Sequence, residues 1–472
     1  MAKQPKTTLG VLVGTRGFFP THLAHTGRKV LLDVLKEEGF ATVCLSAKEA
    51  TGGAVESLAD ARACADLFRA NREAIDGIVV TLPNFGDEKA VANTLRFAGL
   101  DVPVLVHAWP DDAKRMDLEN RRDAFCGKLS VCCNLDQYGI PFSLTDLHTV
   151  DPASESFRAD VRRFGATCRV VRGLKGARVG AVGARTGPFN TVRYSEKLLE
   201  VAGISVETLD LSEVLGRAAA LTPNDRALAA KLRAIRGYTD TSAVTDASLD
   251  RMARFALVLD RWIAEMGLSG TAIQCWTALE EHYGIVPCAV MSMMSEALKP
   301  SACEVDVTGL VGMLALRYAT ESPAAIVDWN NNYGDDPDRC VLFHCSNLPK
   351  SLFAEHRMEV QEIIAQSVGP DNASGSIVGR LAAGAFTYCR VDTDDIEGEI
   401  RAYVGEGALT DDPLDTFGGR GVAHIPDLQD LLAFICRMGF EHHVAIALGE
   451  VAGAIEDAFE TYFGWETYNH AG

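Results

Sequence analysis

The first hundred residues alternate between two hydrophobic patterns. Short runs that are almost wholly apolar occur at 8–14, 41–46, 77–83 and 102–109. Between them, apolar residues recur at helical spacing over 21–38, 57–73 and 87–98. Continuous apolar strands separated by amphipathic helices are typical of a parallel sheet that helices cover on both faces. The pattern predicts a doubly wound α/β domain, which we assign to residues 1–165.

A second series of the same kind follows a cluster of Asp, Pro and Ser at 150–157. Apolar runs that favour strands lie in 177–186, 204–211, 270–276 and 324–329. Helical patterns lie near 191–202, over much of 223–267, and at 286–298. We therefore expect a second doubly wound parallel-sheet domain over 166–338.

The pattern changes beyond about residue 340. Apolar and polar residues alternate at 385–392, 398–407 and 421–425, which suits antiparallel strands with one exposed face. Helices are expected near 426–438 and 448–463, on either side of the segment EHHVAIAL. These features predict a β-rich, barrel-like domain over 339–472, so the fold class is α/β with two doubly wound domains and a β-rich third.

Composition supports a multidomain globular protein. The chain has 472 residues, of which 47% are hydrophobic and 23% charged, and this length exceeds what one core usually organises. The net charge of −19 comes without a long basic run, which disfavours nucleic acid as a partner and leaves a small molecule as the expected one. No apolar run approaches about 18 residues and no signal-like segment opens the chain, so we expect no membrane contact and a cytoplasmic location.

The thirteen cysteines are scattered without a CxxC pair and are interpreted as buried thiols.

The loop after the first strand, GTRGFFPTHLAHTGRK, is a candidate ligand-binding segment. It lacks both G-x-G-x-x-G and the P-loop pattern, so a nucleotide is not indicated. Arg16, His22 and His25 are candidate substrate contacts at this sheet edge, with a solvated turn as the alternative.

Three later segments carry groups that can hold a divalent cation. Glu304 and Asp306 precede an apolar helix, Asp328 ends a strand, and His442 and His443 lie side by side after Glu441. Two acids and one imidazole form a common divalent metal arrangement, and oxygen-rich ligation favours Mn²⁺, Mg²⁺ or Co²⁺ over zinc.

Each group also has an ordinary structural interpretation. Asp306 is favoured as the N-cap of the following helix rather than as a ligand. Asp328 could close an Asx-turn, Glu304 could be a solvated loop acid, and the two histidines could be one buried and one exposed strand residue.

The segments GTAIQCW, ACEVDVTGLVGMLAL, IVDW and EHHV resemble those of the L-fucose isomerase and L-arabinose isomerase superfamily. The resemblance covers the whole chain and is strongest over 270–345 and 440–447. It implies aldose–ketose isomerisation with Mn²⁺ as the usual metal. Glu304 and Asp328 match the family's metal-binding and catalytic acids, and His443 matches its third metal ligand, with His442 as the neighbour.

The same resemblance implies a homo-oligomer, a trimer or hexamer, in which the first domain can complete a neighbour's site. Arg16 would then act on the site of another subunit. The side chains expected to contact the substrate around the metal are Gln274, Trp276, Trp329, Asn330 and His344. For the two tryptophans, core packing is the alternative interpretation.

The stretch DWNNNYG…VLFHCSN departs from a typical fucose isomerase. His344 falls where arabinose isomerases carry a metal-binding histidine, so it is either a ligand, a substrate contact or structural. The chain thus resembles a divergent fucose isomerase-like member, and its sugar is not specified by the sequence.

Moving a proton between C1 and C2 of an open-chain sugar requires a base beside the ene-diol and a cation near its two oxygens. The sequence leaves open which carboxylate is the base. The alternatives are a non-catalytic sugar-binding or regulatory protein on this scaffold, and a different metal-dependent reaction on a modified sugar.

Overall fold

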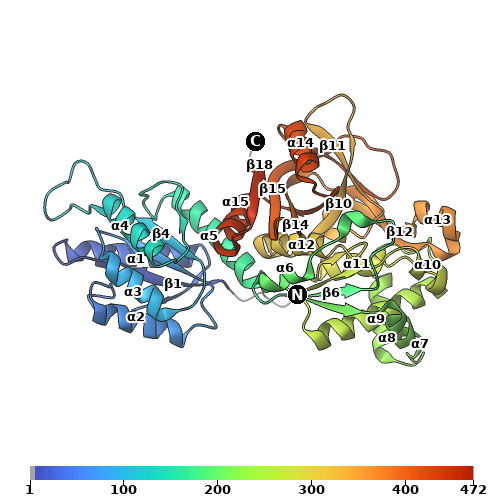
Figure 1. The fold of residues 1–472 in the computed structure, drawn as a ribbon, viewed down its shortest axis with the longest axis horizontal. Coiled ribbons are helices and arrows are strands. Elements are labelled where there is room, and N and C mark those ends of the chain that lie inside the picture. The colour runs from blue at the N-terminus through green and yellow to red at the C-terminus, as the bar shows by residue number, and fades with distance from the viewer. Residues whose placement is uncertain (1–5, 471–472) are drawn as a thin grey trace. The chain divides into compact units, whose positions relative to one another are not determined.

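A computed structural model describes residues 6–470 of the chain (Figure 1). The described residues form two compact units. The first comprises the residues up to 172 together with 457–464, and the second comprises 173–456 together with the residues from 465 onward.

The first unit is built on a parallel sheet of five strands in the order β2-β1-β3-β4-β5. The strands are β1 (Thr8–Val13), β2 (Ala41–Cys44), β3 (Gly77–Leu82), β4 (Val104–Ala108) and β5 (Ser143–Leu144). The helices are α1 (Thr21–Glu37), α2 (Leu58–Ala70), α3 (Glu88–Ala98), α4 (Ala124–Gln137) and most of α5 (Glu155–Leu174), with a π-helical segment at Ala458–Phe463. Every residue of β3 and β4 is buried, as expected for strands covered on both faces. This strand order is doubly wound, so the prediction for the first domain is confirmed.

The second unit contains a parallel sheet of four strands in the order β7-β6-β8-β9. The strands are β6 (Arg178–Val182), β7 (Ser205–Leu209), β8 (Gly270–Ile273) and β9 (Ser301–Ala302). The helices are α6 (Glu196–Val201), α7 (Leu211–Ala219), α8 (Arg226–Arg236), α9 (Asp246–Met266), α10 (Ala278–Tyr283), α11 (Cys288–Glu296) and α12 (Val307–Thr320), and a 3₁₀ turn spans Asn190–Val192. The second predicted α/β fold is therefore also present.

The rest of the second unit is a β-barrel. Six strands, β16-β11-β10-β17-β14-β15, close on themselves because β15 also pairs with β16. They span β10 (Ala325–Asn332), β11 (Arg339–His344), β14 (Gly384–Asp394), β15 (Glu399–Thr410), β16 (Gly419–His424) and β17 (His443–Leu448). The remaining elements are β12 (Phe353–Val360), β13 (Ser374–Leu381), β18 (Glu466–His470), α13 (Glu362–Val368), α14 (Leu428–Met438), α15 (Ala452–Asp457), and 3₁₀ turns at Lys350–Leu352 and Pro370–Asn372. The β-rich, barrel-like fold is confirmed.

One strand lies in a different sheet from the one predicted. The sequence pattern places the run 324–329 in the second parallel sheet, but β10 pairs antiparallel with β11 and β17 in the barrel. Its apolar residues are buried on both faces, and a helix precedes it, so its local pattern is the same as that of a parallel strand. The domain boundaries at 165/166 and 338/339 stay predictions.

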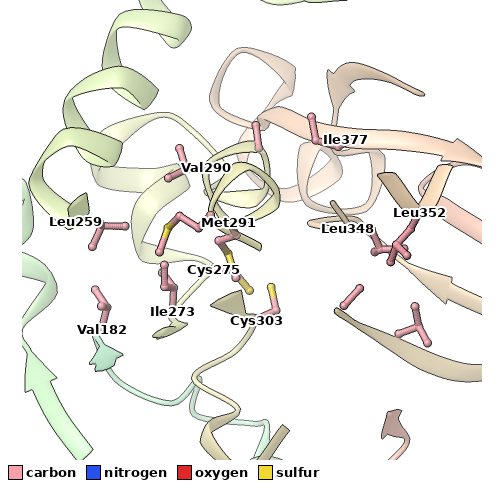
Figure 2. Close-up of a cluster of buried hydrophobic side chains, with 14 of the residues drawn as sticks. Val182, Leu259, Ile273, Cys275, Val290, Met291, Cys303, Leu348, Leu352 and Ile377 are labelled. Carbon is pink, nitrogen blue, oxygen red and sulfur yellow. The ribbon is translucent and has the colours of Figure 1, made fainter. Parts of the chain in front are cut away.

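Helix α12 joins the parallel sheet of the second unit to the barrel. It is apolar around most of its circumference, and it packs against β8 and β9 as well as against β14 and β17. A single core of buried side chains extends from the parallel sheet into the barrel segments, and Figure 2 shows Val182 and Ile273 together with Leu348 and Ile377 from this core. The segment just before α12 is therefore held rigidly between the two sheets. No helix within residues 6–470 is both long and apolar enough to cross a membrane.

Candidate active site

Glu304 lies in the turn between β9 and α12. Its φ is 54° and that of Val305 is 59°, so two consecutive non-glycine residues adopt the left-handed conformation. Such backbone strain is concentrated at functional sites, where the surrounding structure maintains it. The indole N–H of Trp276 donates to Oε1 of Glu304 over 3.1 Å, which leaves Oε2 facing the other way.

Asp328 reaches the same place from the barrel. In the antiparallel ladder of β10 and β17, Asp328 lies directly opposite His443. A β-bulge follows between Trp329 and Asn331, and bulges near active sites change the direction of the following side chains. The strand thus aligns Asp328 with His443 and then departs from regular pairing.

The imidazole of His443 faces both carboxylates. Its Nε2 lies 3.5 Å from Oδ1 of Asp328 and 3.6 Å from Oε2 of Glu304. Both oxygens are buried and have no hydrogen-bond partner within residues 6–470. Buried polar atoms normally have hydrogen-bond partners, so these two oxygens are candidates to bind a ligand.

Asp306 has two roles that the structure makes visible. Its Oδ1 accepts the backbone N–H of Gly309 over 2.8 Å, so the prediction that Asp306 caps the following helix is confirmed. Its Oδ2 lies 2.9 Å from Nδ1 of His443. When Nδ1 donates its proton to a carboxylate, the lone pair of Nε2 remains available, which is the usual arrangement behind a metal-binding histidine.

A buried arginine holds Asp306 in place. The guanidinium of Arg390, fully buried, donates to Asp306 over 2.6 and 3.1 Å, to Glu441 over 2.6 and 2.8 Å, and to Thr308 over 3.0 Å. The space for it depends on Gly309, because a Cβ there would lie 2.7 Å from Nη1 of Arg390. Sequence analysis missed Arg390; its only local signal is a basic residue within the apolar part of a strand.

The site's titration reflects burial and these neighbours. Burial raises the pKa of Asp328 to about 6, although His344 and His443 oppose the shift. Burial would lower the pKa of His443, but its hydrogen bond to Asp306 and the nearby carboxylates raise it. The pKa of Asp306 is lowered despite burial because Arg390 and His443 favour its charged form. Of the groups that face one another here, His443 is the one whose proton a cation would displace, because its pKa is raised.

The neighbouring histidines differ in placement. His442 is exposed over 45% of its side chain, and its Nε2 is 3.9 Å from Oδ1 of Asp328. Burial, with the positive charge of His443, lowers the pKa of His442 to about 4. His344 is buried, and one of its ring nitrogens lies within 4.8 Å of a ligand atom of both Glu304 and His443. The structure therefore brings His344 to the site, beside the better-placed His443.

Two other predicted residues, Gln274 and Trp276, follow strand β8. Trp276 contacts Glu304 directly, and Gln274 accepts the backbone N–H of Ala184 through its Oε1 over 3.0 Å. Gln274 thereby fixes the loop after β6. That loop carries Phe189, whose ring centroid lies 5.5 Å from that of His443 and 6.0 Å from that of Trp276. Phe189 was missed because its position in a loop gave no periodic signal.

Within the second unit, Trp329 and Asn330 are not brought to the carboxylates. Trp329 donates its indole N–H to Tyr403 over 3.0 Å and packs edge-on against Tyr388 in the barrel core. With Asn330 it lines a separate cavity of about 650 Å³. Arg16 lies in the first unit, where its guanidinium pairs with Glu88 and covers the ring of Phe85. In the same unit His22 and His25 are exposed. The substrate roles of Arg16, Trp329 and Asn330 stay predictions.

The donor set fits a divalent cation. Ligands at right angles around a cation with bonds of about 2.1 Å lie about 3 Å apart, and Nε2 of His443 lies slightly further than this from each carboxylate oxygen, at 3.5 and 3.6 Å. Carboxylates suit Mg²⁺ and Mn²⁺, and imidazole adds affinity for transition metals. Glu304, Asp328 and His443 could therefore hold such an ion, with His344 within reach.

Comparisons with known proteins place the chain in a family. Residues 10–175 match the fucose/sulfoquinovose isomerase N-terminal domain, and residues 342–470 match the L-fucose isomerase C-terminal domain. The chain belongs to the fucose isomerase-like family. It is accordingly an isomerase, an intramolecular oxidoreductase of the aldose–ketose type that acts on a sugar.

Three relatives of this fucose isomerase-like chain are each described as a sulfoquinovose isomerase. The protein of Priestia aryabhattai is 22% identical over 450 residues, which are 95% of this chain and 96% of the relative. Those of Alkalicoccus urumqiensis and Clostridium sp. (strain MSTE9) are 27% and 24% identical, over 62% and 64% of this chain. In both of these cases the match spans 66% of the relative's length.

Proposed function

We propose that this chain is a divalent-metal-dependent isomerase that interconverts an open-chain aldose and its ketose by proton transfer between C1 and C2. The observation that carries the proposal is the pair of buried oxygens, Glu304 Oε2 and Asp328 Oδ1, that face Nε2 of His443 without hydrogen-bond partners among the described residues. Mn²⁺ is the proposed ion, with Mg²⁺ or Co²⁺ as substitutes.

The protein's own groups divide the proton transfers between them. Isomerisation moves one proton from C2 to C1 and one from the C2 hydroxyl to the C1 oxygen, so protons are transferred both at carbon and at oxygen. Glu304 and Asp328 are the two carboxylates placed to act in these transfers, since one oxygen of each faces His443. The bound cation supplies positive charge that stabilises the two sugar oxygens as they gain negative charge.

The surrounding residues orient these carboxylates. The Trp276 N–H holds Oε1 of Glu304, so the other oxygen is directed towards His443. The ring of Phe189 lies against Trp276 and both histidines, and so provides an apolar wall beside them. Each group is thus positioned before the substrate arrives.

We propose sulfoquinovose as the first substrate to test. The support is that three relatives carry the name sulfoquinovose isomerase. A homo-oligomer, a trimer or hexamer in which Arg16 acts on another subunit's site, is part of the same proposal.

The test uses the full chain, stripped with chelator and then reloaded with Mn²⁺. Sulfoquinovose, glucose, L-fucose and L-arabinose are incubated in D₂O and the products analysed by NMR. We expect ketose formation with at least one sugar, dependence on the added cation, deuterium at C1 or C2, and no turnover by Glu304→Gln. Full activity in the stripped protein, or in the E304Q variant, would refute the mechanism.

A further inference from the structure

Two cysteine side chains lie directly beside Glu304. Cys275 follows β8 and Cys303 follows β9. These strands are parallel neighbours, in which Thr271 pairs with Ser301 and Ala272 pairs with Ala302. Because the carboxyl ends of neighbouring parallel strands meet at one edge of the sheet, both thiols are delivered to the same place. Figure 2 shows the two sulfur atoms close together below Met291.

The thiols and the carboxylate form a compact group. One ligand atom from each of Cys275, Cys303 and Glu304 lies within 4.8 Å of the others, and all three residues are buried. Both thiols are buried, Cys275 being 5% exposed and Cys303 0% exposed. Glu304 in addition has its buried Oε2 without a partner within residues 6–470.

The ligand chemistry of this group differs from that of the site around His443. Two thiolates and one carboxylate suit a thiophilic ion, since zinc and its congener cadmium bind cysteine sulfur, whereas Mn²⁺ prefers oxygen and imidazole. Three protein ligands leave a fourth tetrahedral position open.

We propose that Cys275, Cys303 and Glu304 form a second cation site that selects Zn²⁺ or Cd²⁺. It shares Glu304 with the group of Asp328 and His443. A thiophilic ion bound there withdraws Glu304 from the other cation, so the two ions compete. The thiolate site stands on its own geometry, and only the competition rests on the proposed function.

The experiment titrates the chelator-stripped full chain with Cd²⁺ and follows the ultraviolet absorption of sulfur-to-cadmium charge transfer. Only cadmium bound to thiolate gives this absorption band, so cadmium bound by oxygen and imidazole does not contribute to it. The variants are Cys275→Ala and Cys303→Ala. The matched control is Cys340→Ala, which removes another buried thiol of the same unit.

We expect the wild type and C340A to bind about one Cd²⁺ with the band, and C275A and C303A to lose at least tenfold in affinity for it. An undiminished band in both C275A and C303A would overturn the proposed site. If the variants fail to fold, mass-spectrometric mapping of alkylation in the wild type decides instead. Cd²⁺ must then slow the modification of Cys275 and Cys303 more than that of Cys340.

The competition is read separately by electron paramagnetic resonance of Mn²⁺. Cd²⁺ should release bound Mn²⁺ from the wild type in step with the appearance of the charge-transfer band, and C303A should retain Mn²⁺ affinity within about threefold. Mn²⁺ that stays bound while the band saturates would overturn the sharing of Glu304. If no Mn²⁺ binds to the wild type, the proposed function is refuted. The cadmium charge-transfer band still tests the thiolate site in that case.

Discussion

Asp306 accepts a hydrogen bond from Nδ1 of His443 over 2.9 Å, while the other nitrogen of that ring faces Glu304 and Asp328. The same carboxylate caps α12 and pairs with Arg390. The orientation of the histidine is thereby coupled to the start of the helix and to the barrel's one fully buried arginine among the residues described.

Replacing Asp306 by Asn should weaken cation binding without removing a direct ligand. The loss of a carboxylate behind a metal-binding histidine typically costs about 10–100-fold in affinity. We expect a decrease of that order for Mn²⁺ in D306N, measured by calorimetry. Glu441→Gln is the control, because it also removes a charge from Arg390 but does not touch His443. Equal losses of Mn²⁺ affinity in the two variants would argue against this role for Asp306.

The two adjacent histidines should differ sharply. Nε2 of His443 lies within 3.6 Å of both carboxylate oxygens, whereas His442 is exposed over 45% of its side chain and is 3.9 Å from Asp328 alone. Loss of a direct ligand should cost more than loss of an outer partner, so His443→Asn should lower Mn²⁺ affinity at least about 100-fold and His442→Asn less than about tenfold. Binding isotherms of the two variants give the comparison. The reverse order would exchange the roles of the two residues.

Arg390→Met should destabilise the metal-free protein strongly. Removing one partner from a buried ion pair leaves uncompensated charge and typically costs about 3–5 kcal/mol. Here the stranded groups are Asp306 and Glu441, both buried. Arg380→Met is the control, because its partner Asp411 is exposed over 84% of its side chain, and such a pair contributes about 0–1 kcal/mol. Urea unfolding of both variants gives the comparison, and similar losses would contradict the assignment.

Stability should depend on pH through Glu280. Burial raises the pKa of this fully buried carboxyl from 4.5 to about 8, and neither of its oxygens has a hydrogen-bond partner within residues 6–470. A raised pKa means that the folded state binds the proton more tightly than the unfolded state. The stabilisation is complete below pH 4.5 and is lost as the pH rises through 8, at about 1.4 kcal/mol per pKa unit.

Glu280→Gln should therefore flatten the decline of the unfolding temperature between about pH 5 and about pH 8.5, the range bracketing that shift. Its exposed neighbour Glu281 supplies the control variant, Glu281→Gln, which should keep the wild-type slope. An unchanged slope in E280Q would show that this carboxyl does not govern the pH dependence.

The sequence predicted the parallel sheets well because their signals are local. Strands such as β3 and β4 are buried throughout and are flanked by helices with clear caps, for example Asp87 and Gly99 around α3. The direction in which β10 pairs was not predictable, because it depends on β11 and β17, and β17 lies far along the chain.

The same distinction applies to the site. Glu304, Asp328 and His443 could be selected by residue type and by resemblance, and the structure brings their side chains together. Arg390 could not be predicted, because its partners Asp306 and Glu441 lie 84 and 51 residues away. For Trp329, closeness in sequence to Asp328 suggested a place in the site. Successive side chains of a strand point to opposite faces, and its indole packs in the barrel core.

The register that sets Asp328 opposite His443 has a consequence for how this scaffold can diversify. A shift of one residue would turn either side chain to the other face of the sheet, so the pairing of β10 with β17 tolerates no slip. The connections beyond these strands carry no such constraint. Loops can therefore lengthen, shorten or change in charge, and so select a different sugar, while the groups that face one another across the two strands remain the same.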